Sequence, residues 1–466
     1  MSERIHLNID ETDGLPLKER VFAVLSIGFA LCMSVLDVNI MNVVLPTLSH
    51  DFGTTPSMTT WIVNIYQLAI VISLLSFSAL GEIWGYRKVY LSGIFFFCIT
   101  SLICALSGDF VTLTTARFFQ GLSAAALTSV NTAQLRYIYP ESKLARGMAI
   151  NAMIVAISAA AGPTVAGAIL SIASWHWLFA INIPLGLISL VLGMRYLPRL
   201  EIRNKHRFDY VSSIANALFF GLLIYSLEGF AHKGTHTHLF LSLSVVAIIG
   251  TFYIHRELHQ KSPLLPLDLL RIPIFSLSII TSICSFSAQM LAMVSLPFFF
   301  QDTLGYNEVL TGMLLTSWPL TTLFAAPLAG VLADRIHPGI LGSIGMTAFF
   351  IGLVSLSFID ASTQAITIVP RLMLCGFGFG FFQTPNNGTI ISSAPPKRSG
   401  GASGMLGMAR LLGQTTGTTM VALLLGMIIS PERGTVTCLL VGAGFALLAA
   451  VISSLRLSQP STLKRK

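Results

Sequence analysis

The sequence predicts an all-α polytopic membrane protein with fourteen transmembrane helices. Three observations lead to this fold class. Of the 466 residues, 54% are apolar and only 10% are charged, whereas a soluble domain averages about 25% charged residues. The apolar residues gather in runs long enough to cross a hydrocarbon core of about 30 Å, and the basic residues gather between alternate runs. With charges placed this way, the net charge of +8 does not indicate a nucleic-acid partner, and we expect a lipid bilayer instead.

The apolar runs number fourteen. The stretch before the first run is polar, carries both charge signs and lacks the features of a cleaved signal peptide, so we expect that run to remain as a signal-anchor. The predicted spans are 21–46, 58–80, 88–106, 111–135, 147–172, 175–194, 210–230, 239–255, 275–300, 309–333, 338–358, 365–391, 400–428 and 434–455.

The basic residues fix an orientation. If the N-terminus lies inside, only Lys233 and Arg433 of the 28 Lys and Arg fall in outer loops, and Arg117, Arg371 and Arg410 fall within spans or at their mouths. All the others fall in inner segments, as the positive-inside rule requires. The sequence therefore predicts a multi-pass protein with both termini in the cytoplasm.

Two stretches repeat along the chain. Glu82 follows the second span as Asp334 follows the tenth, and Arg117 heads the fourth span as Arg371 heads the twelfth. Two like bundles joined in this way place a cavity at their interface and alternate its access by rocking. We therefore expect two six-helix bundles and two inserted central helices: residues 1–20 as a cytoplasmic tail, 21–197 as the first bundle, 198–272 as the insert, 273–456 as the second bundle and 457–466 as a basic cytoplasmic tail.

Several motifs then carry a resemblance over nearly the whole chain. They are Asp37–Pro46 on the first span, Ser78–Lys88 after the second with its copy Gly330–Arg335, Arg117–Gly121 on the fourth, and Ser158–Gly167 on the fifth. Together the sequence resembles the major facilitator superfamily, specifically its fourteen-span drug:proton antiporters, among them bacterial exporters of quaternary ammonium compounds. It departs from the family pattern at Val44, Glu82, Ile83, Ser158 and Ala166, among others.

Asp37 is the only carboxylate deep inside any predicted span. Burial penalises its charged form, which makes it a plausible proton carrier. The alternative is a structural aspartate bonded to neighbouring helices. The resemblance implies that Arg117 assists proton coupling, and the alternative is an arginine that snorkels to the interface.

The resemblance assigns two further motifs. It implies a conformational latch for the outward-facing state at Glu82, Gly85, Arg87, Lys88, Gly330, Asp334 and Arg335, against the alternative of a solvated basic loop. It also implies an antiporter motif at Gly162, Pro163 and Gly167, and hence export. Small residues alone would indicate only that two helices touch.

The expected cargo is a small lipophilic or cationic molecule exchanged for protons. Polar and aromatic candidates to line the cavity are Trp61, Tyr66, Gln67, Asn131, Gln289, Met290, Trp318, Phe382, Gln383, Asn386 and Asn387, with Glu228 as a reserve acid. Each alone is more often ordinary packing. With one deep carboxylate, we expect monovalent cations or neutral lipophiles to be handled better than dications.

The sequence does not indicate ATP hydrolysis, metal binding or redox chemistry. No phosphate-binding loop occurs, so the chain alone is not expected to use ATP. Cys32, Cys98, Cys104, Cys284, Cys375 and Cys438 fit buried hydrophobic positions, and His232, His236 and His238 fit a solvated loop better than a metal site. We expect a monomer in the bacterial inner membrane, without cofactor, metal or enzymatic activity. The alternatives are a proton-coupled importer of the same fold and a membrane-embedded sensor or enzyme.

Overall fold

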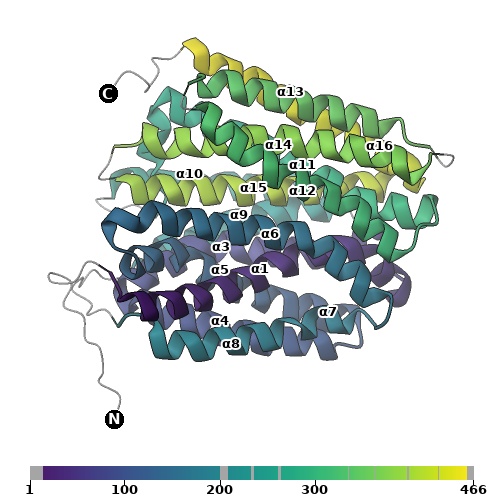
Figure 1. Cartoon of the computed structure of the whole chain (residues 1–466). Helices are drawn as coiled ribbons and strands as arrows, with labels where there is room; N and C mark the ends of the chain where they lie inside the picture. Colours follow the sequence, from purple (N-terminus) through teal and green to yellow (C-terminus); the bar gives the residue numbers. More distant parts are fainter. Residues whose placement is uncertain are drawn as a thin grey trace.

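The chain folds into a bundle of long helices. The computed structural model describes residues 14–199, 208–231, 236–260, 264–333, 335–360, 363–395, 398–428 and 430–458. The start of α1 and the end of α16 lie at the same end of the bundle (Figure 1). We call this the termini end and the other the far end.

The helices fall into three groups along the chain. The first half comprises α1 (Leu17–Phe52), α2 (Pro56–Thr59), α3 (Trp61–Trp84), α4 (Tyr86–Leu106), α5 (Phe110–Ile138), α6 (Leu144–Leu170), α7 (His176–Ala180) and α8 (Asn182–Tyr196). The insert comprises α9 (Tyr210–Ala231) and α10 (His236–His259). The second half comprises α11 (Pro273–Phe298), α12 (Glu308–Ala333), α13 (Pro338–Ser357), α14 (Ala365–Ser393), α15 (Ser399–Met427) and α16 (Pro431–Leu455). With α2–α3 and α7–α8 each taken as one segment, every predicted span has its helix.

Eleven helical segments among the described residues are long and apolar enough to cross a membrane. The segments α5, α9 and α15 are not among them. In α5 the reason is chemical, because Arg117, Gln120 and Gln134 are buried inside the protein and lower the helix's hydropathy. The all-helical membrane architecture is confirmed, while the count of fourteen spans remains a prediction.

Local sequence explains several helix ends. The Asp109 carboxylate accepts a hydrogen bond from the Thr112 amide at 2.9 Å, which caps α5. Thr55 caps α2, and Pro56 occupies its first turn. Gly85, with φ of 95°, separates α3 from α4, a conformation that favours glycine. These ends allow tight connections between antiparallel helices.

The two halves lie side by side, with the first half purple to teal and the second green to yellow in Figure 1. Helix α6 packs on α12, α2 and α3 pack on α15, and α1 packs on α11. Hydrogen bonds between the halves join Ser57 Oγ to Ala422 O (2.8 Å), Gln301 Nε2 to Val43 O (3.0 Å), His50 Nε2 to Asp302 Oδ1 (3.0 Å), Thr164 Oγ1 to Thr316 Oγ1 (2.7 Å) and Thr418 Oγ1 to Gln67 Oε1 (3.3 Å). Within the described chain these bonds lie in the middle of the bundle or toward the far end, so the halves are fastened there.

The insert covers one seam between the halves. Helix α9 packs on both α3 and α15, and α10 packs on α9. Asn216 of α9 donates to Ile72 O of α3 at 3.1 Å and accepts from the Tyr253 hydroxyl of α10 at 3.2 Å. On the side of α15 the contact belongs to an apolar cluster that includes Ala215 and Met405. The polar connection therefore ties the insert to the first half.

Candidate functional site

Asp37 lies on α1 in the interior of the first half. Only 2% of the residue is exposed. Its Oδ2 accepts a hydrogen bond from Arg117 Nη1 at 2.5 Å, and both side chains are almost completely buried. The structure thus brings together two residues that are 80 positions apart in the sequence and were singled out there separately.

Helix geometry adds Gln120 to the pair. Residues three apart lie on the same face of a helix, so Arg117 and Gln120 both point from α5 toward α1. Gln120 Nε2 donates to Asp37 Oδ1 at 3.2 Å, and Gln120 Oε1 accepts from Arg117 Nη1 at 2.8 Å. The amide therefore bridges the two charges.

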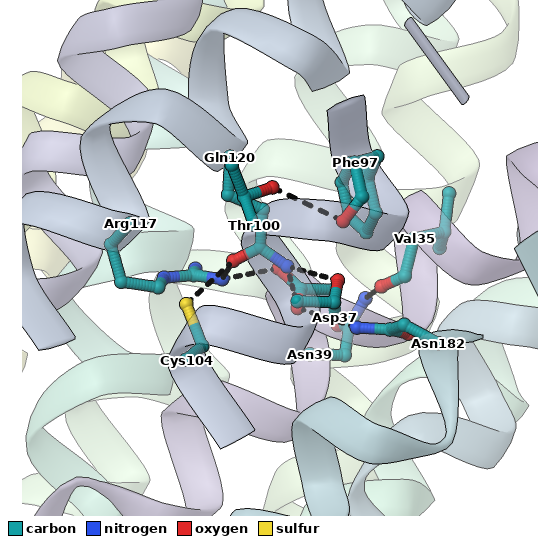
Figure 2. A network of polar contacts seen from close by, with 10 residues as sticks. Val35, Asp37, Asn39, Phe97, Thr100, Cys104, Arg117, Gln120 and Asn182 are labelled. Carbon is teal, nitrogen blue, oxygen red and sulfur yellow. Dashed lines mark hydrogen bonds and ion pairs between the residues drawn. The ribbon is translucent and has the colours of Figure 1, made fainter. Parts of the chain in front are cut away.

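The rest of the network comes from two further helices (Figure 2). Asn182, at the start of α8, donates to Asp37 Oδ1 at 3.0 Å. On α4, Ser101 Oγ accepts from Gln120 Nε2 at 2.9 Å. Four elements therefore fix the carboxylate, which accepts three hydrogen bonds in its ionised form.

Arg117 is less completely satisfied than Asp37. Its Nε and Nη2 find no hydrogen-bond partner among the described residues. Its guanidinium carbon lies 4.1 Å from the centroid of the Tyr66 ring and 5.7 Å from that of Phe179, and an aromatic face attracts a cation. The arrangement is a buried ion pair in which Arg117 has three further neighbours, the amide of Gln120 and the two aromatic rings.

The predicted antiporter motif lies where the halves meet. A Cβ atom on Gly167 would lie 2.7 Å from Glu308 O, and one on Gly312 would lie 2.2 Å from Pro163 O. A Cβ atom on Gly162 would lie 2.6 Å from Asn39 Cβ of α1. Helix α6 thus packs backbone against backbone with α12, which only small residues permit.

The predicted latch is described only in part. Arg87 Nη2 donates to Met194 O at 2.5 Å, at the carbonyl end of α8, where a cation is favoured. Glu82, Lys88 and Arg335 are exposed, and Gly85 and Gly330 are partly exposed. Asp334 lies outside the described residues. The latch role remains a prediction.

The cavity candidates fall into two groups. Six are buried and have partners: Tyr66 under Arg117, Gln67 with Thr418, Asn131 with Asn151, Met290 against Gly417, Trp318 against Gly376, and Asn386 with Ser278 and Ser282. Phe382 is also buried. Trp61, Gln289, Gln383 and Asn387 are partly exposed. The side chain of Glu228 lies outside the described part of the chain, as do those of His232, His236 and His238.

Sequence reasoning did not single out three interior groups. Gln120 lies in the motif Arg117–Gly121 and Asn182 in the predicted span 175–194, but neither was given a role, although an amide in an apolar span is a signal that needs a partner. Arg456, fully buried, donates to Asn386 Oδ1 at 2.8 Å and to the hydroxyls of Ser278 and Ser453. In the sequence it counted only among the basic residues of the inner segments. Among the described residues no group of His, Cys, Asp and Glu has the arrangement of a metal site.

A comparison with protein families decides the class of this fold. Residues 27–418 match the profile of the Major Facilitator Superfamily. The chain belongs to the major facilitator superfamily.

Individual proteins that are similar to this facilitator in sequence are also named as transporters or as a multidrug resistance protein. It is 55% identical to "Uncharacterized transporter YebQ" of Escherichia coli (strain K12), over 97% of this chain and 98% of that one. It is 28% identical to "Riboflavin transporter RibZ" of Clostridioides difficile (strain 630), over 86% and 87%. It is 29% identical to "Multidrug resistance protein Stp" of Mycobacterium tuberculosis (strain CDC 1551 / Oshkosh), over 86% and 75%.

Solved structures of the same fold are also similar. A POT family transporter in complex with a thioalcohol-conjugated peptide matches with a TM-score of 0.68 and 16% identity, over 93% of this facilitator and 95% of that chain. A bacterial homologue of the human lysosomal transporter Spinster, inward-facing and unoccupied, matches with a TM-score of 0.66 and 12% identity, over 95% and 97%. The chain is therefore a multi-pass membrane transporter, and the resemblance found in the sequence is confirmed.

Proposed function

We propose that this facilitator is a proton-coupled antiporter that exports small lipophilic molecules by alternating access. The observation that carries the proposal is the buried Asp37–Arg117 ion pair, held by Gln120 and Asn182. An intramembrane ionisable residue is expensive and usually functional. Asp37 is the only carboxylate deep in the described helices, since the others lie near helix ends or in loops.

The proposed cycle uses protonation to change the packing of the first half. When Asp37 is ionised, α1, α5 and α8 are joined through its two oxygens. Protonation removes the charge that Arg117 needs, and the three helices separate at that point. A proton that enters from outside and leaves inside would thereby bias the rocking of the halves once per cycle.

The topology completes the proposal. We place the termini end in the cytoplasm and count fourteen spans in a bacterial inner membrane, on the distribution of Lys and Arg. The fastening of the halves at the far end supports an inward-facing state. Export follows from the family-like motif at Gly162, Pro163 and Gly167.

The test is efflux from proteoliposomes that are loaded with a fluorophore. We would use ethidium as a cation, Nile red as a neutral molecule and 1-anilinonaphthalene-8-sulfonate as an anion, and impose a pH gradient with the acid on the far-end side. At least one fluorophore should leave faster when the gradient is present, and Asp37→Asn should abolish that acceleration while substrate exchange without a gradient continues. An importer would instead accumulate the fluorophore together with protons.

Asp109→Asn is the matched control, because Asp109 is an exposed carboxylate that caps α5. It should keep pH-driven efflux near the unmodified rate. Undiminished pH-driven efflux by Asp37→Asn would remove the basis of the proposed coupling.

A further inference from the structure

A second arginine lies in the interior between the halves and has no role in the proton site. Arg410 is the twelfth residue of α15, about 16 Å along the helix from its first residue. Its side chain is exposed, although α15 packs on α3, α9 and α11. Exposure of this kind is typical of a residue that lines an interior hollow.

The neighbours of α15 show which way Arg410 points. Cβ atoms on Gly404 and Gly407 would meet Leu75 and Leu74 of α3, at 4.0 and 3.7 Å. A Cβ atom on Gly413 would meet Ile283 O of α11 at 2.6 Å. Three residues turn a helix by about 300°, so the direction of Arg410 bisects those of Gly407 and Gly413. Arg410 therefore faces the space between α3 of the first half and α11 of the second.

Arg410 has no counter-charge there. No hydrogen bond or ion pair joins its side chain to another residue of the described chain. The deep carboxylate, Asp37, is already engaged by Arg117. An arginine inside a membrane is costly unless something pairs with it, and a ligand that carries a negative charge would supply that partner.

The surroundings reinforce a positive charge at this level. Asn386 of α14 bonds to Ser278 and Ser282 of α11, close to the carbonyl of Ile283 that faces Gly413. The buried Arg456 donates to the same Asn386, and its partners are neutral. The interior of the second half thus carries two guanidiniums without a carboxylate among the described residues, whereas the ion pair in the first half is neutral.

Neutral hydrogen-bonding groups lie on the same helix and on α14. Gln414 follows Arg410 by one turn of α15, and Gln383 and Asn387 flank Asn386 on α14. All three side chains are partly exposed, and none is hydrogen-bonded to another described residue. They offer both donors and acceptors for a polar molecule.

We propose that Arg410 binds the anionic group of the transported molecule, so that the preferred cargo is a small organic anion with an apolar body. This inference rests on the proposed export function and names its substrate class. It replaces the cationic cargo expected from the sequence, because the one carboxylate that would attract a cation is already neutralised by Arg117. A guanidinium matches a carboxylate with two parallel hydrogen bonds.

The test is direct binding to the purified, detergent-solubilised full-length protein, measured by isothermal titration. Three ligands of nearly equal shape are compared: 1-naphthoate, 1-naphthamide and 1-naphthylmethylammonium. The unmodified protein should bind the carboxylate at least about tenfold more tightly than the amide, and the cation most weakly. Arg410→Gln should remove that preference and leave the affinity for the amide within about twofold, while Arg410→Lys should retain part of it.

Arg433→Gln is the matched control, because it removes an exposed arginine at the far end of α16 and should leave all three affinities unchanged. Preference for the cation by the unmodified protein, or unaltered carboxylate binding by Arg410→Gln, would overturn the proposal. The comparison among ligands on the unmodified protein decides the matter even if Arg410→Gln does not fold. No gradient is applied, so a failure of proton coupling in the transport assay would leave this result standing, and the two proposals can fail separately.

Discussion

Asp37 and Arg117 show how a charge is kept inside a membrane protein. Each side chain is almost completely buried, and the carboxylate accepts hydrogen bonds from Arg117, Gln120 and Asn182. The attraction between two buried charges roughly offsets the free energy of removing them from water, but a single remaining charge has no such compensation. The pair is therefore sensitive to the loss of either member and tolerant of the loss of both.

A double-mutant cycle tests this sensitivity. Arg117→Gln and Asp37→Asn should each lower the free energy of unfolding by about 3–5 kcal/mol, because each leaves one uncompensated buried charge. The double variant should be less destabilised than the sum of the two, with a coupling energy of about 2–3 kcal/mol. The measurement is reversible unfolding in mixed micelles. Simple additivity would contradict the burial of the pair.

The matched control is the exposed ion pair between Arg398 and Asp268, whose atoms are also 2.5 Å apart. The same cycle on this pair should give a coupling below about 1 kcal/mol, because solvent screens exposed charges. Equal distance with unequal coupling would isolate burial as the cause.

The sequence could identify the charged residues of the site but not its geometry. A charged residue stands out in an apolar run by its residue type alone, which is why Asp37 and Arg117 were predicted separately. The choice of Asn182 as a third partner depends on how α8 packs on α1. Arg410 was noticed only as a charge within a span, since its lack of a partner is visible only when the neighbours of α15 are known.

At the scale of helices, polarity and packing explain which parts of the structure the sequence predicted and which parts it did not. The predicted spans match helices because apolar runs of about 20 residues have one stable form in a bilayer. The true helices extend further, as in α1, which runs from Leu17 to Phe52 where 21–46 was expected, because hydropathy marks the apolar portion and not the caps. The packing of α9 on α3 and α15 was not predicted. It depends on few polar groups, so the sequence offers little that would indicate the neighbours of α9.

Asn216 holds α9 to the first half, and its removal should loosen the insert. Asn216→Ala deletes the bond to Ile72 O and leaves the buried Tyr253 hydroxyl without that partner. The expected loss in the free energy of unfolding is about 1–3 kcal/mol. Ser213→Ala is the control on the same helix, because the buried Ser213 hydroxyl has no hydrogen-bond partner among the described residues, and its removal should be neutral or stabilising. Equal losses for the two variants would argue against a specific tether.

The stability of the insert at its termini end should depend on pH. Partial burial disfavours the Asp209 carboxylate, but hydrogen bonds from the Ser212 amide, Gln260, the Ser212 hydroxyl and Arg256 outweigh it and lower the pKa to about 2. A pKa that is lower in the folded than in the unfolded state stabilises the fold above the unfolded value of about 4, and this contribution is lost as the pH falls toward 2.

Hydrogen exchange at the start of α9 measures this effect. Protection should be constant from pH 7 to about pH 4, after correction for the intrinsic exchange rate, and should decrease between about pH 4 and 2. Asp209→Asn should show no such decrease, because it cannot ionise. A decrease of the same size in the variant would assign the effect to another group.

At the scale of the whole molecule, the two halves differ in their interior charges. Arg117 and Arg371 occupy corresponding positions, but Arg117 pairs with Asp37 while Arg371 Nη1 donates to Ser355 O at 2.9 Å. The second half instead has Arg410 and Arg456 toward the termini end. Under the proposed function, one half responds to protons and the other holds an anion, and the proposed rocking of the halves joins the two events.

That rocking requires the far end to open, which a cross-link should prevent. Thr164 Oγ1 of α6 and Thr316 Oγ1 of α12 lie 2.7 Å apart across the interface, so cysteines at these positions would face each other across it. Oxidation of the variant Thr164→Cys/Thr316→Cys should abolish transport, and a reductant should restore it. The matched control is Ser26→Cys/Ser189→Cys, whose hydroxyls are 3.5 Å apart within the first half. Its disulfide should leave transport intact, because it joins two helices of the same half about 16 Å along α1 from Asp37. Transport that continues at full rate through the oxidised Thr164–Thr316 pair would mean that the halves do not separate at this contact.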